Sequence, residues 1–289
     1  PGCICGTESC PWHLTIERCW FTPYLPDFRF QTPGVMDQVL GDVTYWLDRF
    51  DLDGLRIDAV PMMPRSVTRR IAHDIRSRYA PRRATLLLGE IFTGPDGLES
   101  LAYHLGPAGL DSVFDFPLMW ALRGAIANDS GGFDQVDAVL AESEQRLAGS
   151  GAVLARIIDN HDTTRFISEA VGDAGGDPWL SPAAQPEDAT PYRRTALALA
   201  ITFTLPGIPV LYQGDEIGLA GASDPDNRRV MPATLSDPQA ELAATVERLG
   251  ALRRCSRALR HGDRQAVHVT KATYAYRRTL TDEADEALV

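Results

Sequence analysis

The feature that most constrains the fold is a repeated alternation between short apolar runs and segments with helical spacing of apolar residues. This order predicts βα units around a parallel sheet, and therefore an α/β fold. Five runs are predicted as strands, at 52–60 (LDGLRIDAV), 84–92 (ATLLLGEIF), 111–118 (DSVFDFPL), 152–160 (AVLARIIDN) and 208–216 (IPVLYQGDE).

Helical patterns precede, separate and follow these runs. After Gly262 the pattern of residues changes. In AVHVTKATYAYRRTL, apolar and polar residues alternate, as they do in antiparallel β-structure. A separate small β domain is therefore expected to begin near Gly262. The predicted helices cover 36–50, 65–79, 119–129, 133–149, 192–205 and 239–259.

Most of the predicted strands end in polar residues. In parallel α/β folds the functional groups gather at the carboxyl ends of the strands, so these side chains are expected to meet at one pocket. The ends carry Asp58, Glu90, the triplet Asn160, His161 and Asp162, and the pair Asp215 and Glu216, the last two interpreted as structural.

Arg56 and Asp58 stand two residues apart in the first strand and should point to the same side. The guanidinium would keep Asp58 ionised and oriented. Glu90 follows the apolar run LLLG, a setting that favours the protonated form required of a general acid. Acids at several strand ends suit glycoside hydrolysis, although the same oxygens could hold Mg²⁺ or Ca²⁺.

The composition limits the classes of binding partner that are expected. The 289 residues carry a formal net charge of −11, which argues against nucleic acid and suits an uncharged or cationic small ligand. No run approaches the ~20 apolar residues that cross a bilayer, and no signal sequence opens the chain. We expect neither a nucleic-acid nor a membrane partner; oligomeric state is left open.

Four of the five cysteines crowd the first nineteen residues, at positions 3, 5, 10 and 19. This favours two local disulfides, with three pairings open, over free thiols or a zinc site of unusual spacing. Disulfides would indicate a secreted or periplasmic protein, with a cytoplasmic location left open. Cys255 is expected to be a small buried side chain on a helix.

Several stretches together resemble glycoside hydrolase family 13, the α-amylase family. GLRIDAV, LLGEIF and IIDNHD resemble its catalytic segments, and GIPVLYQGDEIGLAG resembles its last-strand signature. YLPDFRF is similar to its LPDLN element, and FDFPL to its sixth strand. The pieces occur in order across residues 25–220.

The resemblance implies a (β/α)8 TIM barrel, of which this chain would hold about strands four to eight. Five strands do not close a barrel, so we expect the chain to lack the first three strands. The implied division is a Cys-rich remnant of an inserted subdomain at 1–34, the barrel portion at 35–262, and the start of a C-terminal antiparallel β domain at 263–289.

The resemblance also implies a retaining mechanism on α-1,4-glucosidic bonds of starch, glycogen or maltooligosaccharides. The nucleophile maps onto Asp58, with Arg56 beside it, and the general acid/base onto Glu90. His161 and Asp162 would bind the sugar. A calcium ion is implied only weakly, because Asp27 is the one matching acid and another usual ligand belongs to a motif absent from these residues. No organic cofactor is expected.

The chain departs from many α-amylases after the nucleophile, where Pro61 and Met62 replace a Lys-His pair. DPDNRRVMP resembles a loop of neopullulanase-like members. An α-glucosidase, a maltogenic or neopullulanase-like enzyme, or a transglycosylase is therefore the alternative to an α-amylase. A non-catalytic binding relative is a second alternative, disfavoured because all three acids remain.

Three other side chains have open roles. Arg165 and Arg228 could touch substrate or support the scaffold. Trp179, in the long loop after the fourth predicted strand, could stack on a sugar ring or pin that loop.

Overall fold

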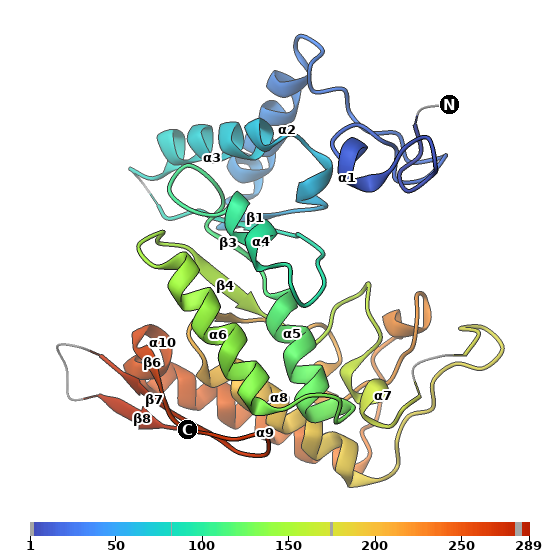
Figure 1. The fold of residues 1–289 in the computed structure, drawn as a ribbon, viewed down its shortest axis with the longest axis vertical. Helices are drawn as coiled ribbons and strands as arrows, with labels where there is room; N and C mark the ends of the chain where they lie inside the picture. The colour runs from blue at the N-terminus through green and yellow to red at the C-terminus, as the bar shows by residue number, and fades with distance from the viewer. Residues whose placement is uncertain (1–2, 82, 174–175, 281–284) are drawn as a thin grey trace. The chain divides into compact units, whose positions relative to one another are not determined.

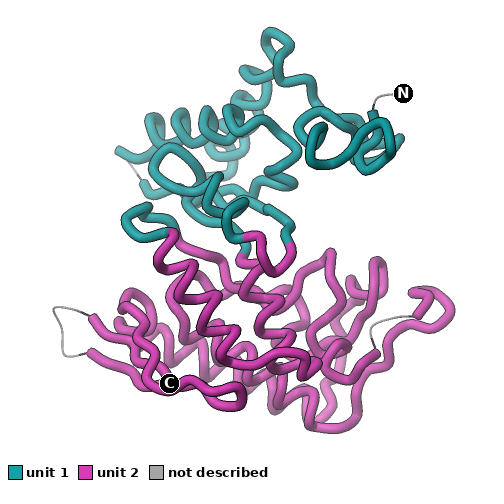
Figure 2. Tube along the Cα trace, viewed as in Figure 1, with its two compact units in different colours: residues 1–93, 98–114, 147–152 teal, residues 94–97, 115–146, 153–289 magenta. Residues whose placement is uncertain are grey.

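The computed structural model describes residues 3–81, 83–173, 176–280 and 285–289. Where a predicted segment includes residues 1–2, 82, 174–175 or 281–284, those positions lie outside the described residues. The chain divides into two compact units (Figure 2). Unit 1 comprises residues 1–93, 98–114 and 147–152, and unit 2 comprises residues 94–97, 115–146 and 153–289.

Unit 1 contains three neighbouring parallel strands and the helices that alternate with them (Figure 1). The strands are β1 (Gly54–Ile57), β2 (Leu86–Gly89) and β3 (Ser112–Phe114). The helices are α1 (Trp12–Thr15), α2 (Val35–Phe50), α3 (Arg65–Tyr79) and α4 (Leu98–His104), with a 3-10 turn η1 (Val60–Met62).

Helix α3 shows why these elements form where the sequence predicted them. Its buried residues include Val67, Ile71, Ile75 and Tyr79, which recur every four residues. This spacing places them on one helical face, while Arg69, Arg70 and Arg78 between them are exposed. The helix therefore forms because one apolar stripe can be buried.

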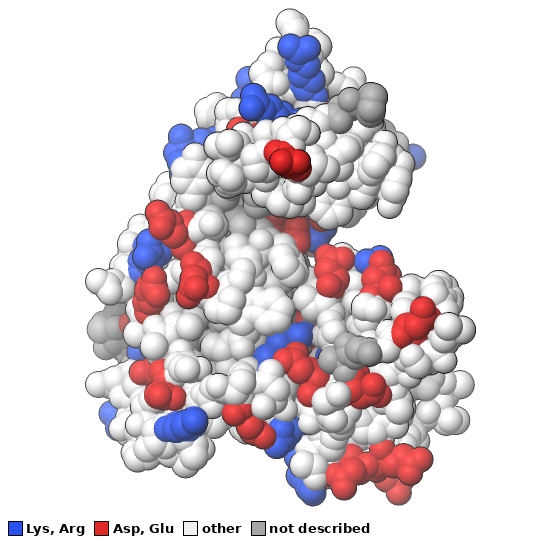
Figure 3. Space-filling model, turned by 45° about the vertical axis from the view of Figure 1, so that its right-hand side comes forward, with Lys and Arg blue, Asp and Glu red and all other residues white. Residues whose placement is uncertain are grey.

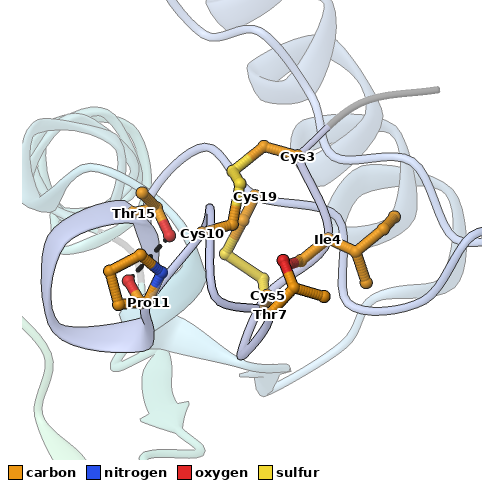
Figure 4. Close-up of a disulfide and its surroundings, with 8 residues drawn as sticks. All are labelled: Cys3, Ile4, Cys5, Thr7, Cys10, Pro11, Thr15 and Cys19. Carbon is orange, nitrogen blue, oxygen red and sulfur yellow. Dashed lines mark hydrogen bonds between the residues drawn. A yellow bond between two sulfur atoms is a disulfide. The ribbon is translucent and has the colours of Figure 1, made fainter.

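Two disulfides join the N-terminal residues, as the sequence predicted (Figure 4). Cys3 pairs with Cys10, and Cys5 pairs with Cys19. Within this segment the Thr15 hydroxyl donates to the Pro11 carbonyl oxygen at 2.8 Å. The pairing itself came only from the structure.

Unit 2 combines a parallel strand pair, a helical layer and a separate antiparallel sheet. The strands are β4 (Val153–Arg156) and β5 (Ile208–Pro209), then β6 (Asp263–Val269), β7 (Tyr274–Thr279) and β8 (Glu286–Leu288). The helices are α5 (Phe116–Leu122), η2 (Arg123–Ala127), α6 (Phe133–Leu147), α7 (Phe166–Ala170), α8 (Ala189–Thr204), η3 (Asp215–Ile217), η4 (Asp226–Arg228), α9 (Asp237–Cys255) and α10 (Arg257–His261).

The core of unit 2 lies among α5, α6, α8 and α9, and Tyr276 of β7 belongs to it. The hydroxyls of Tyr276 and Thr204 are hydrogen-bonded at 2.5 Å. The fully buried Arg278 donates to the carbonyl oxygens of Thr204 and Gly262. These contacts hold β7 against the C-terminal end of α8. The predicted domain division at Gly262 stays a prediction, although β6 begins at the next residue.

The structure corrects several sequence-based boundaries. The helix predicted at 239–259 is interrupted at Ser256, whose extended backbone ends α9 and whose hydroxyl accepts the Leu259 N–H at the start of α10. Cys255, predicted to be buried, is exposed at the end of α9. The strand predicted at 111–118 ends at Phe114, because Asp115 caps α5 by accepting the Leu118 N–H. The short helices α4 and α7 were not predicted.

In the described part of the chain, every helix is too short or too polar to span a bilayer. Acidic and basic side chains are interspersed over the face drawn in Figure 3. The expectation of no nucleic-acid partner stays a prediction.

Candidate active site

Asp58 directly follows β1, and its side chain is 76% exposed. The Arg56 guanidinium forms an ion pair with its Oδ1. The two side chains therefore lie on the same side of the strand, as their spacing predicted. The Arg56 Cζ also lies 6.0 Å from the centroid of the Phe114 ring. Ring and carboxylate together orient the guanidinium beside Asp58.

Glu90 follows β2 and is only 6% exposed. Its position is set by the register of the sheet, in which Ile57 of β1 lies opposite Gly89 of β2. The Glu90 N–H donates to the Ile57 carbonyl oxygen at 2.8 Å. Glu90 Oε2 accepts the N–H of Ala59 at 3.0 Å. The carboxylate of Glu90 therefore binds the residue that directly follows Asp58.

Ala59 has a left-handed backbone, with φ 41° and ψ 48°. This conformation is unfavourable for a residue with a Cβ and is held only where the surroundings impose it. Here the N–H of Ala59 is bound by Glu90, and the N–H of Val60 donates to the Glu90 carbonyl oxygen at 2.9 Å. The strained turn thus links the segments of Asp58 and Glu90 through two hydrogen bonds.

In unit 2, His161 and Asp162 lie side by side in the turn after β4. The His161 Nε2 lies 3.2 Å from Asp162 Oδ2. The Asp162 N–H donates to Oδ1 of Asn160 at 3.0 Å, which fixes the backbone of the turn. The side chains of His161 and Asp162 are 41% and 38% exposed, so both remain open to a ligand.

Arg228, in η4, supports this turn. Its guanidinium donates to Asp162 Oδ1 at 3.2 Å, and its Nε donates to the His161 carbonyl oxygen at 3.1 Å. The same Nε lies 3.1 Å from Oδ1 of Asp224. The amide of Asn227 also donates to the His161 carbonyl oxygen, at 2.9 Å. The sequence left the role of Arg228 open, because it showed only that this arginine lies in the segment DPDNRR.

Behind the turn lies a buried charged cluster. The Arg165 guanidinium donates to Asp215 at 3.2 Å and lies 3.7 Å from Asp159. Its Cζ stacks 3.8 Å from the ring centroid of Tyr212, whose N–H donates to Asp215. Burial, reinforced by the neighbouring Asp159 carboxylate, raises the pKa of Asp215 well above its ordinary value. Arg165 and Asp215 are therefore scaffold residues, as predicted for Asp215.

Tyr212 connects this cluster to the proposed sugar-binding turn. Its ring centroid lies 6.2 Å from that of His161, at an interplanar angle of 58°. Sequence reasoning missed this residue, because a tyrosine inside an apolar strand pattern gives no signal of a functional neighbour. The structure shows that its ring contacts both Arg165 and His161.

Asp27, the predicted calcium ligand, lies in unit 1. Burial raises the pKa of its carboxyl, partly offset by a backbone hydrogen bond from Phe28. Its Oδ2 is buried without a hydrogen-bond partner, as a ligand atom could be. However, no group of three His, Cys, Asp or Glu side chains in the described ranges is arranged to hold a metal. The calcium ion, and Asp27 as its ligand, therefore stay predictions.

The structure thus forms two pairs from the predicted residues. Glu90 contacts the segment of Asp58 in unit 1, and His161 contacts Asp162 in unit 2. Glu90 is buried, whereas the Asp58 carboxylate is exposed and paired with Arg56, so the two carboxyl groups lie in different environments. The meeting of all three acids at one sugar stays a prediction.

The chain is similar to several known proteins. A cyclomaltodextrin glucanotransferase of Geobacillus stearothermophilus is 29% identical over 258 residues, covering 88% of this chain and 32% of the relative. A cyclomaltodextrinase of Geobacillus thermopakistaniensis is 27% identical over 244 residues, covering 84% of this chain and 37% of the relative. The chain therefore spans about a third of the length of these relatives.

Among solved structures, the α-amylase of Geobacillus thermoleovorans complexed with acarbose matches with a TM-score of 0.78 at 27% identity, covering 96% of this chain and 57% of that chain. An Anoxybacillus α-amylase matches with a TM-score of 0.75 at 28% identity, covering 89% of this chain and 52% of that chain. These likenesses confirm the predicted α/β barrel fold class. Residues 12–257 match the family described as alpha amylase, catalytic domain. Because that match extends over most of the chain, the chain belongs to the alpha-amylase family.

Proposed function

We propose that this chain carries the catalytic carboxylates of a retaining glycoside hydrolase that cleaves α-1,4-glucosidic bonds. Asp58 attacks the anomeric carbon and forms a covalent glycosyl-enzyme, while Glu90 protonates the departing oxygen. Glu90 then removes a proton from the water that releases the sugar. Arg56 orients the Asp58 carboxylate through their ion pair, and His161 and Asp162 bind hydroxyls of the distorted sugar ring.

One observation carries this proposal: Glu90 Oε2 accepts the N–H of Ala59, the residue next to Asp58. A retaining glycosidase needs its two carboxyl groups about 5–5.5 Å apart, so acid and nucleophile must come from adjoining segments. Neighbouring strands with Ile57 opposite Gly89 supply such segments. The difference in exposure between Asp58 and Glu90 favours separate roles for the two.

The substrate is proposed as starch, glycogen or maltooligosaccharides, with the oligosaccharides favoured. Similar proteins include cyclomaltodextrin glucanotransferases, cyclomaltodextrinases and a neopullulanase. This supports the alternative raised by DPDNRRVMP, an oligosaccharide-acting hydrolase or a transglycosylase. The two disulfides are compatible with a secreted or periplasmic protein.

The test is hydrolysis of maltoheptaose and soluble starch, with the anomer of the first product followed by NMR. We expect the α-anomer, and transfer products would identify a transglycosylase. Asp58→Asn should lower kcat by at least about 10³-fold, because no covalent intermediate can form. Glu90→Gln should lower it by about 10²- to 10⁴-fold, the usual contribution of a positioned acid/base.

The matched control is Asp53→Asn, an exposed acid just before β1, which should leave activity unchanged. Mass spectrometry with a fluorinated glycosyl fluoride should find the trapped sugar on the peptide that contains Asp58. Release of the β-anomer, or full activity of Asp58→Asn, would refute the mechanism. Binding of maltoheptaose without hydrolysis, by a protein that also holds the first three barrel strands, would favour the non-catalytic relative.

A further inference from the structure

Residues 176–184 form a segment that presents two large apolar side chains to solvent. Trp179 is 78% exposed and Leu180 is 86% exposed. An indole so exposed does not pin its loop, so one of the two roles that the sequence left open falls away. Exposed tryptophans are costly and often mark a binding surface.

The turn that carries Trp179 is tightly hydrogen-bonded. Oδ1 of Asp177 accepts the N–H groups of both Trp179 and Leu180, at 2.8 and 2.9 Å. The Ser181 N–H donates to the Asp177 carbonyl oxygen at 2.9 Å. The backbone at Trp179 is therefore ordered before any ligand arrives, which lowers the entropy cost of binding.

The far end of the segment is tied to the η4 loop. Oδ2 of the buried Asp226 accepts the N–H of Ala183 at 3.0 Å and the N–H of Ala222 at 2.8 Å. Arg229 donates to Oδ1 of Asp226 at 2.7 Å and to the Ala183 carbonyl oxygen. Because Arg228 of the same loop binds Asp162, one short segment, 224–229, supports both Asp162 and the Trp179 turn.

The charge of the chain segment that carries Trp179 narrows the class of ligand. Asp177, Glu187 and Asp188 are exposed acids in the same stretch of chain. These negative charges disfavour anionic lipids and nucleic acid as ligands. An α-glucan is uncharged and offers an apolar ring face on which the indole can stack.

We propose that Trp179 is a stacking platform for a glucosyl unit of an α-1,4-glucan, at a subsite away from the cleaved bond. The class of ligand rests on the proposed function. The subsite should contribute to binding of long oligosaccharides and little to the chemical step.

The experiment measures maltoheptaose binding by calorimetry, with every chain carrying Asp58→Asn so that turnover does not interfere. Trp179→Ala should raise Kd about five- to tenfold, the loss of one aromatic stacking contact. Trp179→Phe, which keeps a ring, should stay within about threefold of the parent chain. The matched control Leu180→Ala, the exposed neighbour on the same turn, should stay within about twofold. Native gels containing soluble starch should rank the variants in the same order.

Equal affinity of the parent and Trp179→Ala chains would overturn the proposal, as would a parent chain that binds neither maltoheptaose nor starch. Loss of sedimentation with phosphatidylcholine vesicles on Trp179→Ala, with unchanged glucan binding, would overturn it in favour of membrane attachment. Failure of the proposed function has a separate signature. Full hydrolysis of maltoheptaose by the Asp58→Asn chain would refute the nucleophile, while the gel comparison at Trp179 would still be valid.

Discussion

Arg228 donates a hydrogen bond to Asp162 across 66 residues of sequence, and with Nε it also binds the carbonyl oxygen of His161. One side chain thus holds both the carboxylate and the backbone of the proposed sugar-binding turn. The imidazole of His161 also contacts this carboxylate, at Oδ2. We infer that Arg228 determines the orientation in which Asp162 meets a sugar.

Arg228→Ala should reduce kcat/KM on maltoheptaose about 10- to 100-fold, because Asp162 loses one of the groups that orient it. The loss should fall mainly on kcat, since binding by Asp162 strengthens in the transition state. Arg228→Lys should recover part of it, because the charge remains without the planar fork. The control is Arg193→Ala, at an exposed position of α8. Unchanged kcat in Arg228→Ala would contradict the positioning role.

Arg165→Met should lower the free energy of unfolding by about 3–5 kcal/mol, because it leaves Asp159 and Asp215 buried without their cation. Arg146→Met breaks an exposed i,i+4 pair with Glu142 and should cost no more than about 0.5 kcal/mol. Urea unfolding followed by circular dichroism measures both. A cost for Arg165→Met as small as that of the control would show that the cluster does not stabilise unit 2.

His104, on α4, makes stability depend on pH. Burial, aided by the Arg65 guanidinium, lowers its pKa to about 4 from 6.5. Between these values the unfolded chain binds the proton and the folded chain does not, so stability falls as the pH drops from about 6.5 to about 4. The loss should be on the order of 3 kcal/mol. His104→Gln should flatten this part of the stability curve, whereas the exposed His73→Gln should not. If unfolding free energy depends on pH equally steeply in His104→Gln, other groups cause that dependence.

The disulfides make a simple prediction about thiol chemistry. The native chain should react with Ellman's reagent at one thiol, Cys255, because the other four cysteines are paired. Replacing Cys5 and Cys19 by Ser opens a loop of 14-residue separation and should destabilise the N-terminal segment by about 3 kcal/mol. Hydrogen exchange over residues 3–21 measures this effect, with Cys255→Ser as the control. More than one reactive thiol in the native chain would contradict the pairing.

Local patterns in the sequence predicted much of the fold. Five strands occur at the five predicted places, because an apolar run bounded by polar residues suits a buried strand. The contact between Arg56 and Asp58 was also predictable, since the two-residue period of a strand places both on one side. Boundaries were less accurate. The break at Ser256 depends on a hydroxyl that accepts the Leu259 N–H, and the helical periodicity on either side gives no sign of it.

By itself the sequence determined the order of the strands and of the longer helices, and the family, because periodicity and residue chemistry act over a few neighbouring positions. The residues that it assigns to catalysis stay a prediction. Only the tertiary structure decided that Glu90 binds the amide of Ala59, that Cys5 pairs with Cys19, and that Arg228 holds Asp162. Each of these contacts joins residues distant in the chain. Their formation depends on sheet register and on the packing of many other groups, which no local pattern encodes.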